Sequence, residues 1–215
     1  MLEDKRRLSS KIFDLDNVIM RFFSRVFDIV VLNFIFIICC IPVFTIGASL
    51  TALYSVTLKM VKNEESNIIK GFLKAFKKDF KQGTVIGIIA TIITLLVILD
   101  LKILSVMGND KLKVLQVLCY IVAIWGYIIF LYAFPILAKF KNTTKEIFKN
   151  SIMISIANFK STILLILLNI PFILMLFHSG VSIILLFTIL IICGFSSLAL
   201  VQSFIFYKVF HEYEK

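Results

Sequence analysis

Residues 26–61 read VFDIVVLNFIFIICCIPVFTIGASLTALYSVTLKMV and contain two consecutive hydrophobic stretches. The first, from Val26 to Phe44, is long enough to cross about 30 Å of hydrocarbon as a helix. The second, from Ile46 to Val61, is shorter and carries several hydroxyl side chains. Pro42 lies near the boundary, where a helix is expected to end or kink. This region predicts one membrane span and a second segment whose crossing the local pattern leaves open.

The rest of the chain is equally apolar. Of its 215 residues 60% are hydrophobic, which is more than a soluble fold of this size can bury. The further stretches long enough to span a bilayer are Gly83 to Met107, Val114 to Ala138, Ser161 to Phe177 and Val181 to Phe206. The pattern therefore predicts an all-α, polytopic helical membrane protein, with residues 1–215 forming a single integral membrane domain.

The distribution of basic residues decides whether the second segment crosses. If Ile46 to Val61 returns the chain to its starting side, all of the 23 basic residues except Lys102, Lys111 and Lys113 lie on one side. By the positive-inside rule that side is the cytoplasm. We therefore predict about six membrane segments in three hairpins, with both termini cytoplasmic. A re-entrant pair that stops short of the far side agrees with the same charges.

The turn of the first hairpin carries residues suited to membrane depth. Pro42 stops the first helix, and Gly47 permits a close or left-handed turn. Thr45 and Thr51 can satisfy backbone groups that the turn leaves free. The small residues Gly47 and Ala48 favour close helix packing. We expect these residues to form a tight structural hairpin.

The connector at residues 66–82 has the pattern of a basic amphipathic helix. Its apolar residues Ile69, Phe72, Phe76 and Phe80 recur at spacings of three and four. Its other faces carry the lysines Lys70, Lys74, Lys77, Lys78 and Lys81. Because the helix adjoins membrane spans, we expect it to lie in the interface and to contact anionic lipid headgroups rather than nucleic acid.

The connector that begins at Thr143 repeats the pattern of a surface helix followed by a hairpin. Thr143 and Glu146 have the spacing of a capping box and precede an apolar helical stripe. The chain can thus be divided into three units, residues 11–62, 66–139 and 143–208. The sequence supports duplication and chance similarity of composition equally.

Few residues suggest chemistry. No catalytic, cofactor-binding or metal-binding set can be assembled from the sequence patterns, so we expect a protein that is not an enzyme and needs no cofactor. Asp100 is an ionisable residue near a span, and Asn169 lies two residues before Pro171. These two residues are candidates for a transport pathway; the alternatives are an interfacial carboxylate and a simple proline kink.

Other polar and aromatic residues lie within spans. We expect Asn33 and Gln202 to join helices by hydrogen bonds. Trp125 and Tyr132 lie inside one span, as do Tyr120 and Tyr127. A membrane-interface belt would not place aromatic residues there, so the pattern predicts that they belong to the core of the bundle.

Three segments resemble the YesL family, a group of bacterial membrane proteins catalogued as domain of unknown function 624. The segments are Pro42-Val43-Phe44-Thr45-Ile46-Gly47-Ala48, Thr51-Ala52-Leu53-Tyr54, and Gly71-Phe72 through Ala75-Phe76-Lys77-Lys78-Asp79-Phe80-Lys81-Gln82. The family pattern has an asparagine where this chain has Asp79. Beyond residue 85 the match is one of hydrophobicity alone.

The resemblance implies a multi-pass protein of the plasma membrane of Gram-positive bacteria. Such proteins are often encoded beside carbohydrate uptake transporters and sensor systems, and the family implies no established activity. The leading hypothesis is a non-enzymatic accessory protein whose partner is a transporter permease or a sensor kinase. The alternative is a small membrane transporter in which Asp100 and Asn169 converge near a water-filled cavity. An intramembrane enzyme is the third hypothesis, and the oligomeric state is left open.

Overall fold

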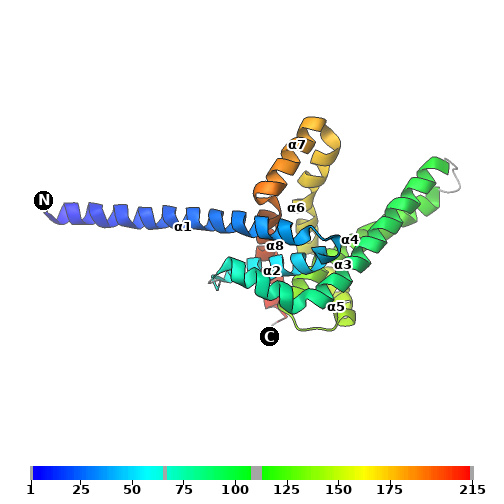
Figure 1. Cartoon of the computed structure of the whole chain (residues 1–215), viewed down its shortest axis with the longest axis horizontal. Coiled ribbons are helices and arrows are strands. Elements are labelled where there is room, and N and C mark those ends of the chain that lie inside the picture. The colour runs from blue at the N-terminus through cyan, green and yellow to red at the C-terminus, as the bar shows by residue number, and fades with distance from the viewer. Residues whose placement is uncertain (1, 65–66, 108–112, 214–215) are drawn as a thin grey trace.

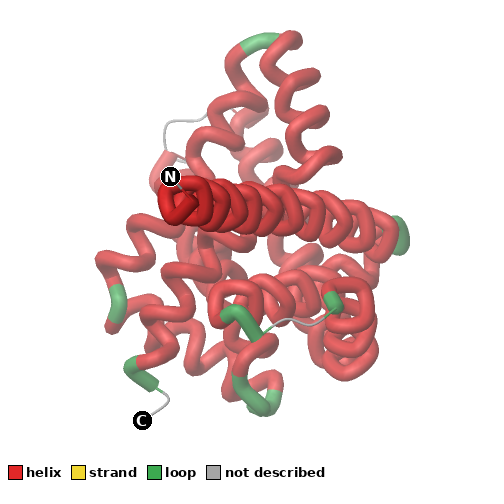
Figure 2. The backbone as a smooth tube through the Cα atoms, turned by 90° about the vertical axis from the view of Figure 1, so that its left-hand side faces the viewer, coloured by secondary structure: helices red, strands yellow, loops and turns green. Residues whose placement is uncertain are grey.

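The structure is a computed structural model that describes residues 2–64, 67–107 and 113–213, with the backbone alone for residues 2–19, 21, 105–107 and 176–178. Within these ranges every element is helical, and short loops join the helices (Figure 2). In chain order the elements are α1 (Leu2–Cys40), η1 (Val43–Thr45), α2 (Ile46–Lys62), α3 (Ile68–Met107), α4 (Lys113–Lys139), α5 (Thr144–Ala157), α6 (Phe159–His178), α7 (Gly180–Ile189), η3 (Leu190–Gly194) and α8 (Phe195–His211).

The helices confirm the prediction of a polytopic helical membrane protein. Five stretches are long and apolar enough to cross a membrane: Phe22–Cys40, Val43–Lys62, Ile68–Leu104, Lys113–Lys139 and Gly180–His211. Helices α5 and α6 make a sixth if they are counted as one span that bends by 99° at a short break. The described part of the chain therefore has five or six segments that can span a membrane.

Helix α2 is the central helix of the bundle (Figure 1). It contacts α1, α3, α4 and α8, and most of its residues are buried. The stretch that contains it, Val43–Lys62, is the least hydrophobic of the candidate spans. This low hydrophobicity has a physical explanation, because polar side chains that face protein can find hydrogen-bond partners that lipid does not offer. The segment whose crossing was open in the sequence is thus the core of the fold.

The turn into α2 is held by hydroxyl groups. Helix α1 ends at Cys40, two residues before Pro42, and a single 3-10 turn leads into α2. The hydroxyl of Thr45 lies 2.6 Å from the carbonyl oxygens of both Cys39 and Pro42, and Ser49 donates to Cys39 at 3.1 Å. These bonds satisfy the Cys39 carbonyl in the last turn of α1, and the Thr45 amide also donates to the Pro42 carbonyl at 2.9 Å.

Helix α3 continues beyond the expected surface segment. The helix expected at residues 66–82 does not end at Gly83 but forms one 40-residue helix with the following span. At about 1.5 Å per residue it is about 60 Å long, twice the hydrocarbon thickness, so part of it lies outside the bilayer core. Ile68, Phe72 and Ala75 on its apolar face are buried in the protein. The buried face is therefore shifted from the predicted stripe: Phe72 belongs to both, but Ile69 is 48% exposed, and Phe76 and Phe80 are only partly buried.

The third unit differs from the first two. Helix α5 begins with the predicted capping box, in which the Thr143 amide donates to Glu146 at 2.7 Å and the Glu146 amide donates to Thr143 Oγ1 at 3.4 Å. Asn158 then separates α5 from α6. Units one and two have no such break between surface helix and span. The threefold repeat stays a prediction.

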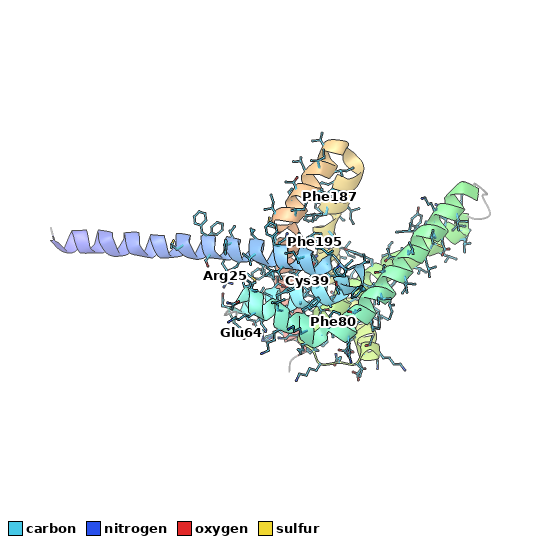
Figure 3. All side chains as sticks on the ribbon, in the orientation of Figure 1. Arg25, Cys39, Glu64, Phe80, Phe187 and Phe195 are labelled. Carbon is cyan, nitrogen blue, oxygen red and sulfur yellow. The ribbon has the colours of Figure 1, made fainter. Side chains whose placement is uncertain are left out.

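Two hairpins diverge from the bundle (Figure 1). One is formed by the far halves of α3 and α4, whose connection at residues 108–112 lies outside the described residues, and the other by α6 and α7. Side chains project from both flanks of the α3–α4 hairpin (Figure 3), and many of its large apolar residues are exposed. In a membrane these faces meet either lipid or another protein.

Candidate functional site

A cavity of about 250 Å³ lies among helices α2, α4, α6 and α8. We call it the central cavity, and the four helices that form it are distant in sequence. The lining residues are Leu50, Leu53, Tyr54, Tyr127, Phe130, Leu131, Phe134, Asn169, Phe195, Leu198, Ala199 and Gln202. Phe195 stands at the foot of the α6–α7 hairpin (Figure 3). The lining is apolar except for two amides and two phenols.

Three of these polar groups form a chain of hydrogen bonds across the bundle. The Tyr54 hydroxyl of α2 donates to Gln202 Oε1 of α8 at 2.5 Å. Gln202 Nε2 donates to Asn169 Oδ1 of α6 at 3.3 Å, and Asn169 Nδ2 donates to the carbonyl of Leu165 at 2.7 Å. The chain ties three helices together at the wall of the central cavity. Gln202 thus joins helices as the sequence predicts.

A second cavity adjoins the first between α3 and α4. We call it the α3–α4 groove; its volume is about 350 Å³. Its lining is Ala90, Ile93, Thr94, Val97, Ile98, Leu101, Ala123, Gly126, Tyr127 and Phe130. Tyr127 and Phe130 line both cavities. Among the described residues, no carboxylate, lysine, arginine or histidine side chain lines either cavity.

Asn33 of α1 stabilises an irregular turn in the last span. Residues Leu190–Gly194 form a π-helical turn, η3, between α7 and α8. Asn33 Nδ2 lies 2.9 Å from the Leu190 carbonyl and 2.8 Å from the Ile191 carbonyl, while the Ser196 amide donates to Asn33 Oδ1 at 3.1 Å. The Asn33 side chain is fully buried. It supplies partners for backbone groups that the π turn leaves without a regular helical partner.

Helices α2 and α3 cross at three glycines. A Cβ on Gly47 would lie 2.1 Å from the Gly83 carbonyl oxygen and 2.7 Å from Gly87 Cα. A Cβ on Gly83 would lie 2.8 Å from Ala48 Cα. Gly83 and Gly87 have the four-residue spacing of a small-x-x-x-small motif, which lets helix backbones touch. Close packing at Gly47 and Ala48 was predicted from the sequence, but Gly83 and Gly87 were not named as their partners. The four-residue spacing of these two glycines is visible in the sequence.

The structure separates the two residues expected in a transport pathway. Asn169 lines the central cavity, whereas Asp100 is exposed on the far half of α3 and lines neither cavity. They do not converge. The reason is the length of α3, which extends Asp100 beyond the bundle. Within the described part of the chain, no cluster of three or more His, Cys, Asp or Glu side chains is placed to hold a metal ion.

The aromatic residues of α4 do not all belong to the core. Tyr132 is fully buried, and its hydroxyl lies 2.8 Å from Thr162 Oγ1 in a hydrogen bond. Tyr120, Trp125 and Tyr127 are 49%, 45% and 40% exposed, so the prediction of a core position is wrong for these three. Tyr120 and Trp125 lie on the part of α4 that leaves the bundle with α3, whereas Tyr127 lines both cavities. In a membrane their exposed faces meet either lipid or another protein.

Comparison with known families gives a match in the first half of the chain. A family model described as "Protein of unknown function, DUF624" matches residues 29–101, about a third of the chain, from α1 through α2 into α3. No curated protein and no solved structure matches the chain. The matched residues contain the first hairpin and the glycine crossing. The match agrees with the resemblance found in the sequence, and residues 29–101 are similar to the DUF624 family of proteins of unknown function.

Proposed function

We propose that this membrane protein is a non-enzymatic accessory subunit of a transport or sensing complex, with carbohydrate uptake as the process that the family resemblance implies. The observation that carries the proposal is the exposure of Trp125. Trp125 lies 12 residues after Lys113, where α4 begins, which is about 18 Å along the helix and within the hydrocarbon region. Lipid-facing tryptophans concentrate instead at the two membrane interfaces.

A partner helix would explain this position. Tryptophan and tyrosine are enriched at the energetic centres of protein interfaces, where they become buried. Tyr120 lies five residues before Trp125 on the same protruding hairpin. The partner that we propose is a transporter permease or a sensor kinase, which packs a membrane helix against the outer face of α4.

Trp125→Ala is expected to release this partner. Tagged protein purified from its native host in mild detergent should co-elute with a permease or sensor kinase, identified by mass spectrometry. Removing an interface hot spot costs about 2 kcal/mol or more, so recovery of the partner should fall by about 30-fold. Leu174→Ala, which truncates a 62% exposed residue on α6, is the matched control and should leave recovery unchanged. Recovery of the protein alone would contradict the proposal.

The central cavity favours a second candidate function, that of a small transporter. Asn169 and Gln202 place two amides beside a cavity enclosed by four helices. If the cavity carries substrate, Asn169→Leu should lower uptake by about tenfold through loss of a substrate hydrogen bond. Asp100→Asn should then have no effect, because Asp100 lies outside the cavity. Uptake that is unchanged in both variants would remove the transporter hypothesis.

The orientation in the membrane is also proposed. The excess of basic residues on one side supports a plasma-membrane protein with both termini in the cytoplasm. Lys70, Lys74, Lys77, Lys78 and Lys81 are all exposed on α3. Their exposure supports contact with anionic lipid headgroups on the cytoplasmic face.

A further inference from the structure

The central cavity and the α3–α4 groove lie next to each other along α4. They share Tyr127 and Phe130 of α4 as a common wall. Separately they measure about 250 and 350 Å³. Their combined volume lies within the range of about 300–1,000 Å³ that is typical of small-molecule sites. The two compartments differ in chemistry, which restricts what can occupy them.

The α3–α4 groove suits an alkyl chain. Ala90, Ala123 and Gly126 line the space between α3 and α4 without filling it, and a Cβ on Gly126 would meet no atom within 4 Å. Ile93 and Ile98 on the rim are 37% and 54% exposed on a membrane-spanning helix. The groove therefore opens toward lipid hydrocarbon.

The central cavity offers hydrogen-bond donors to a ligand. A side-chain amide has two N–H groups, and Gln202 and Asn169 each use one within the polar chain. In the described part of the chain, the second N–H of each amide and the hydroxyl of Tyr127 have no partner. Donors without any cation favour an uncharged oxygen acceptor, such as an ester carbonyl or a hydroxyl, over a phosphate.

The depth of these donors excludes a charged headgroup. Asn169 lies ten residues after the start of α6, and Tyr54, which donates to Gln202, lies eight after the start of α2, or about 15 and 12 Å along these helices. Both are near the middle of about 30 Å of hydrocarbon, where charges are costly. We propose that the two cavities bind an uncharged lipid, with its long chain in the α3–α4 groove and its ester or hydroxyl oxygen at Gln202, Asn169 and Tyr127. This site does not depend on the accessory role.

The single tryptophan of the chain provides a direct test. Trp125 is adjacent in sequence to Gly126 and Tyr127, and bromine atoms on a nearby lipid chain quench its fluorescence. The full chain is placed in phosphatidylcholine nanodiscs, and dioleoylglycerol with dibrominated chains is titrated in. Quenching should saturate at low mole fraction, whereas dibrominated phosphatidylcholine should quench in simple proportion to its amount. Equal, proportional quenching by both lipids overturns the proposal.

Two glycine variants distinguish binding in the α3–α4 groove from non-specific contact of Trp125 with lipid. Gly126→Leu fills the α3–α4 groove and should weaken the saturable quenching by about tenfold or more. Gly180→Leu is the matched control, because a Cβ there also meets no atom within 4 Å but lies at the start of α7. Its quenching should equal that of the unmodified chain. Saturable quenching that survives Gly126→Leu overturns the assignment of the chain to this groove.

Recognition of the lipid's ester or hydroxyl oxygen is tested by one variant of the protein and by two competing lipids. Tyr127→Phe removes a hydroxyl that no described residue uses, so the fold should be unaffected and affinity should fall about two- to tenfold, the range for one hydrogen bond. Methyl oleate carries only an ester and oleyl alcohol only a hydroxyl. Displacement of the brominated probe by one of them identifies the recognised oxygen, and displacement by neither contradicts the proposed recognition.

Discussion

Gly47→Ala is expected to unfold much of the protein, although alanine favours helices. The added Cβ would lie 2.1 Å from the Gly83 carbonyl oxygen and 2.7 Å from Gly87 Cα. Both atoms are backbone, so the clash is relieved only if α2 and α3 move apart. Over-packing of flexible side chains costs about 1–3 kcal/mol, and a backbone clash at a helix crossing should reach or exceed about 3 kcal/mol. That loss lowers the ratio of folded to unfolded protein by about 100-fold.

The measurement is thermal unfolding in mild detergent, followed by loss of the monodisperse peak in size-exclusion chromatography. Gly126→Ala is the matched control, since its Cβ meets no atom within 4 Å. Helix propensity alone predicts a gain of up to about 1 kcal/mol for both variants. A loss of stability for Gly47→Ala together with a gain for Gly126→Ala would establish the close contact of α2 with α3 at the glycines. If Gly47→Ala were as stable as Gly126→Ala, the close contact of α2 with α3 would be wrong.

Asn33→Leu is expected to produce the second large loss. Leucine has a similar size but removes the bonds to the Leu190 and Ile191 carbonyls and from the Ser196 amide. The Ser196 amide is buried and the two carbonyls are partly buried, and within a membrane none of them can turn to water. With about 0.6–2 kcal/mol for each bond in a membrane protein, the expected loss of unfolding free energy is about 2–5 kcal/mol.

The control for Asn33 lies on the last span, close to the π turn. Thr188 is exposed on α7 and donates only to the Ile184 carbonyl of its own helix at 2.9 Å. Thr188→Val should therefore change stability by less than about 0.5 kcal/mol. Thermal unfolding of both variants in the same detergent compares them directly. Equal unfolding temperatures would show that Asn33 does not support the π turn.

Hydrophobic length was sufficient to predict the candidate spans, because long apolar runs have few alternatives to crossing a bilayer. The weak segment Ile46 to Val61 lies within one of them, Val43–Lys62, whereas the side of the membrane that the lysines occupy stays a prediction. The central place of this segment could not be read from the sequence, because hydropathy does not distinguish a helix enclosed by protein from one that faces lipid. For the same reason the exposure of Trp125 was not predicted.

The candidate site was predicted only in its parts. Asn169 and Gln202 were recognisable as polar residues within spans, but their shared cavity depends on how α6 and α8 pack beside α2. Asn33 was expected to join helices, yet its partners lie more than 150 residues away in η3. No local pattern encodes such pairs. Asp100 lies away from the cavity because α3 continues past Gly83, and that continuity is decided by packing against the bundle.

The position of α2 at the centre of the bundle has a consequence for biogenesis. Its hydroxyl and phenol groups are satisfied partly by α8, as in the contacts of Thr57 with Ser203 and of Tyr54 with Gln202. Helix α8 is synthesised long after α2 has left the ribosome, because α3 to α7 lie between them in the chain. Until then α2 is a weakly hydrophobic segment with incomplete partners. The chain therefore completes its core only after α8 has been made, and we expect a chain truncated before α8 to leave the polar groups of α2 without these partners.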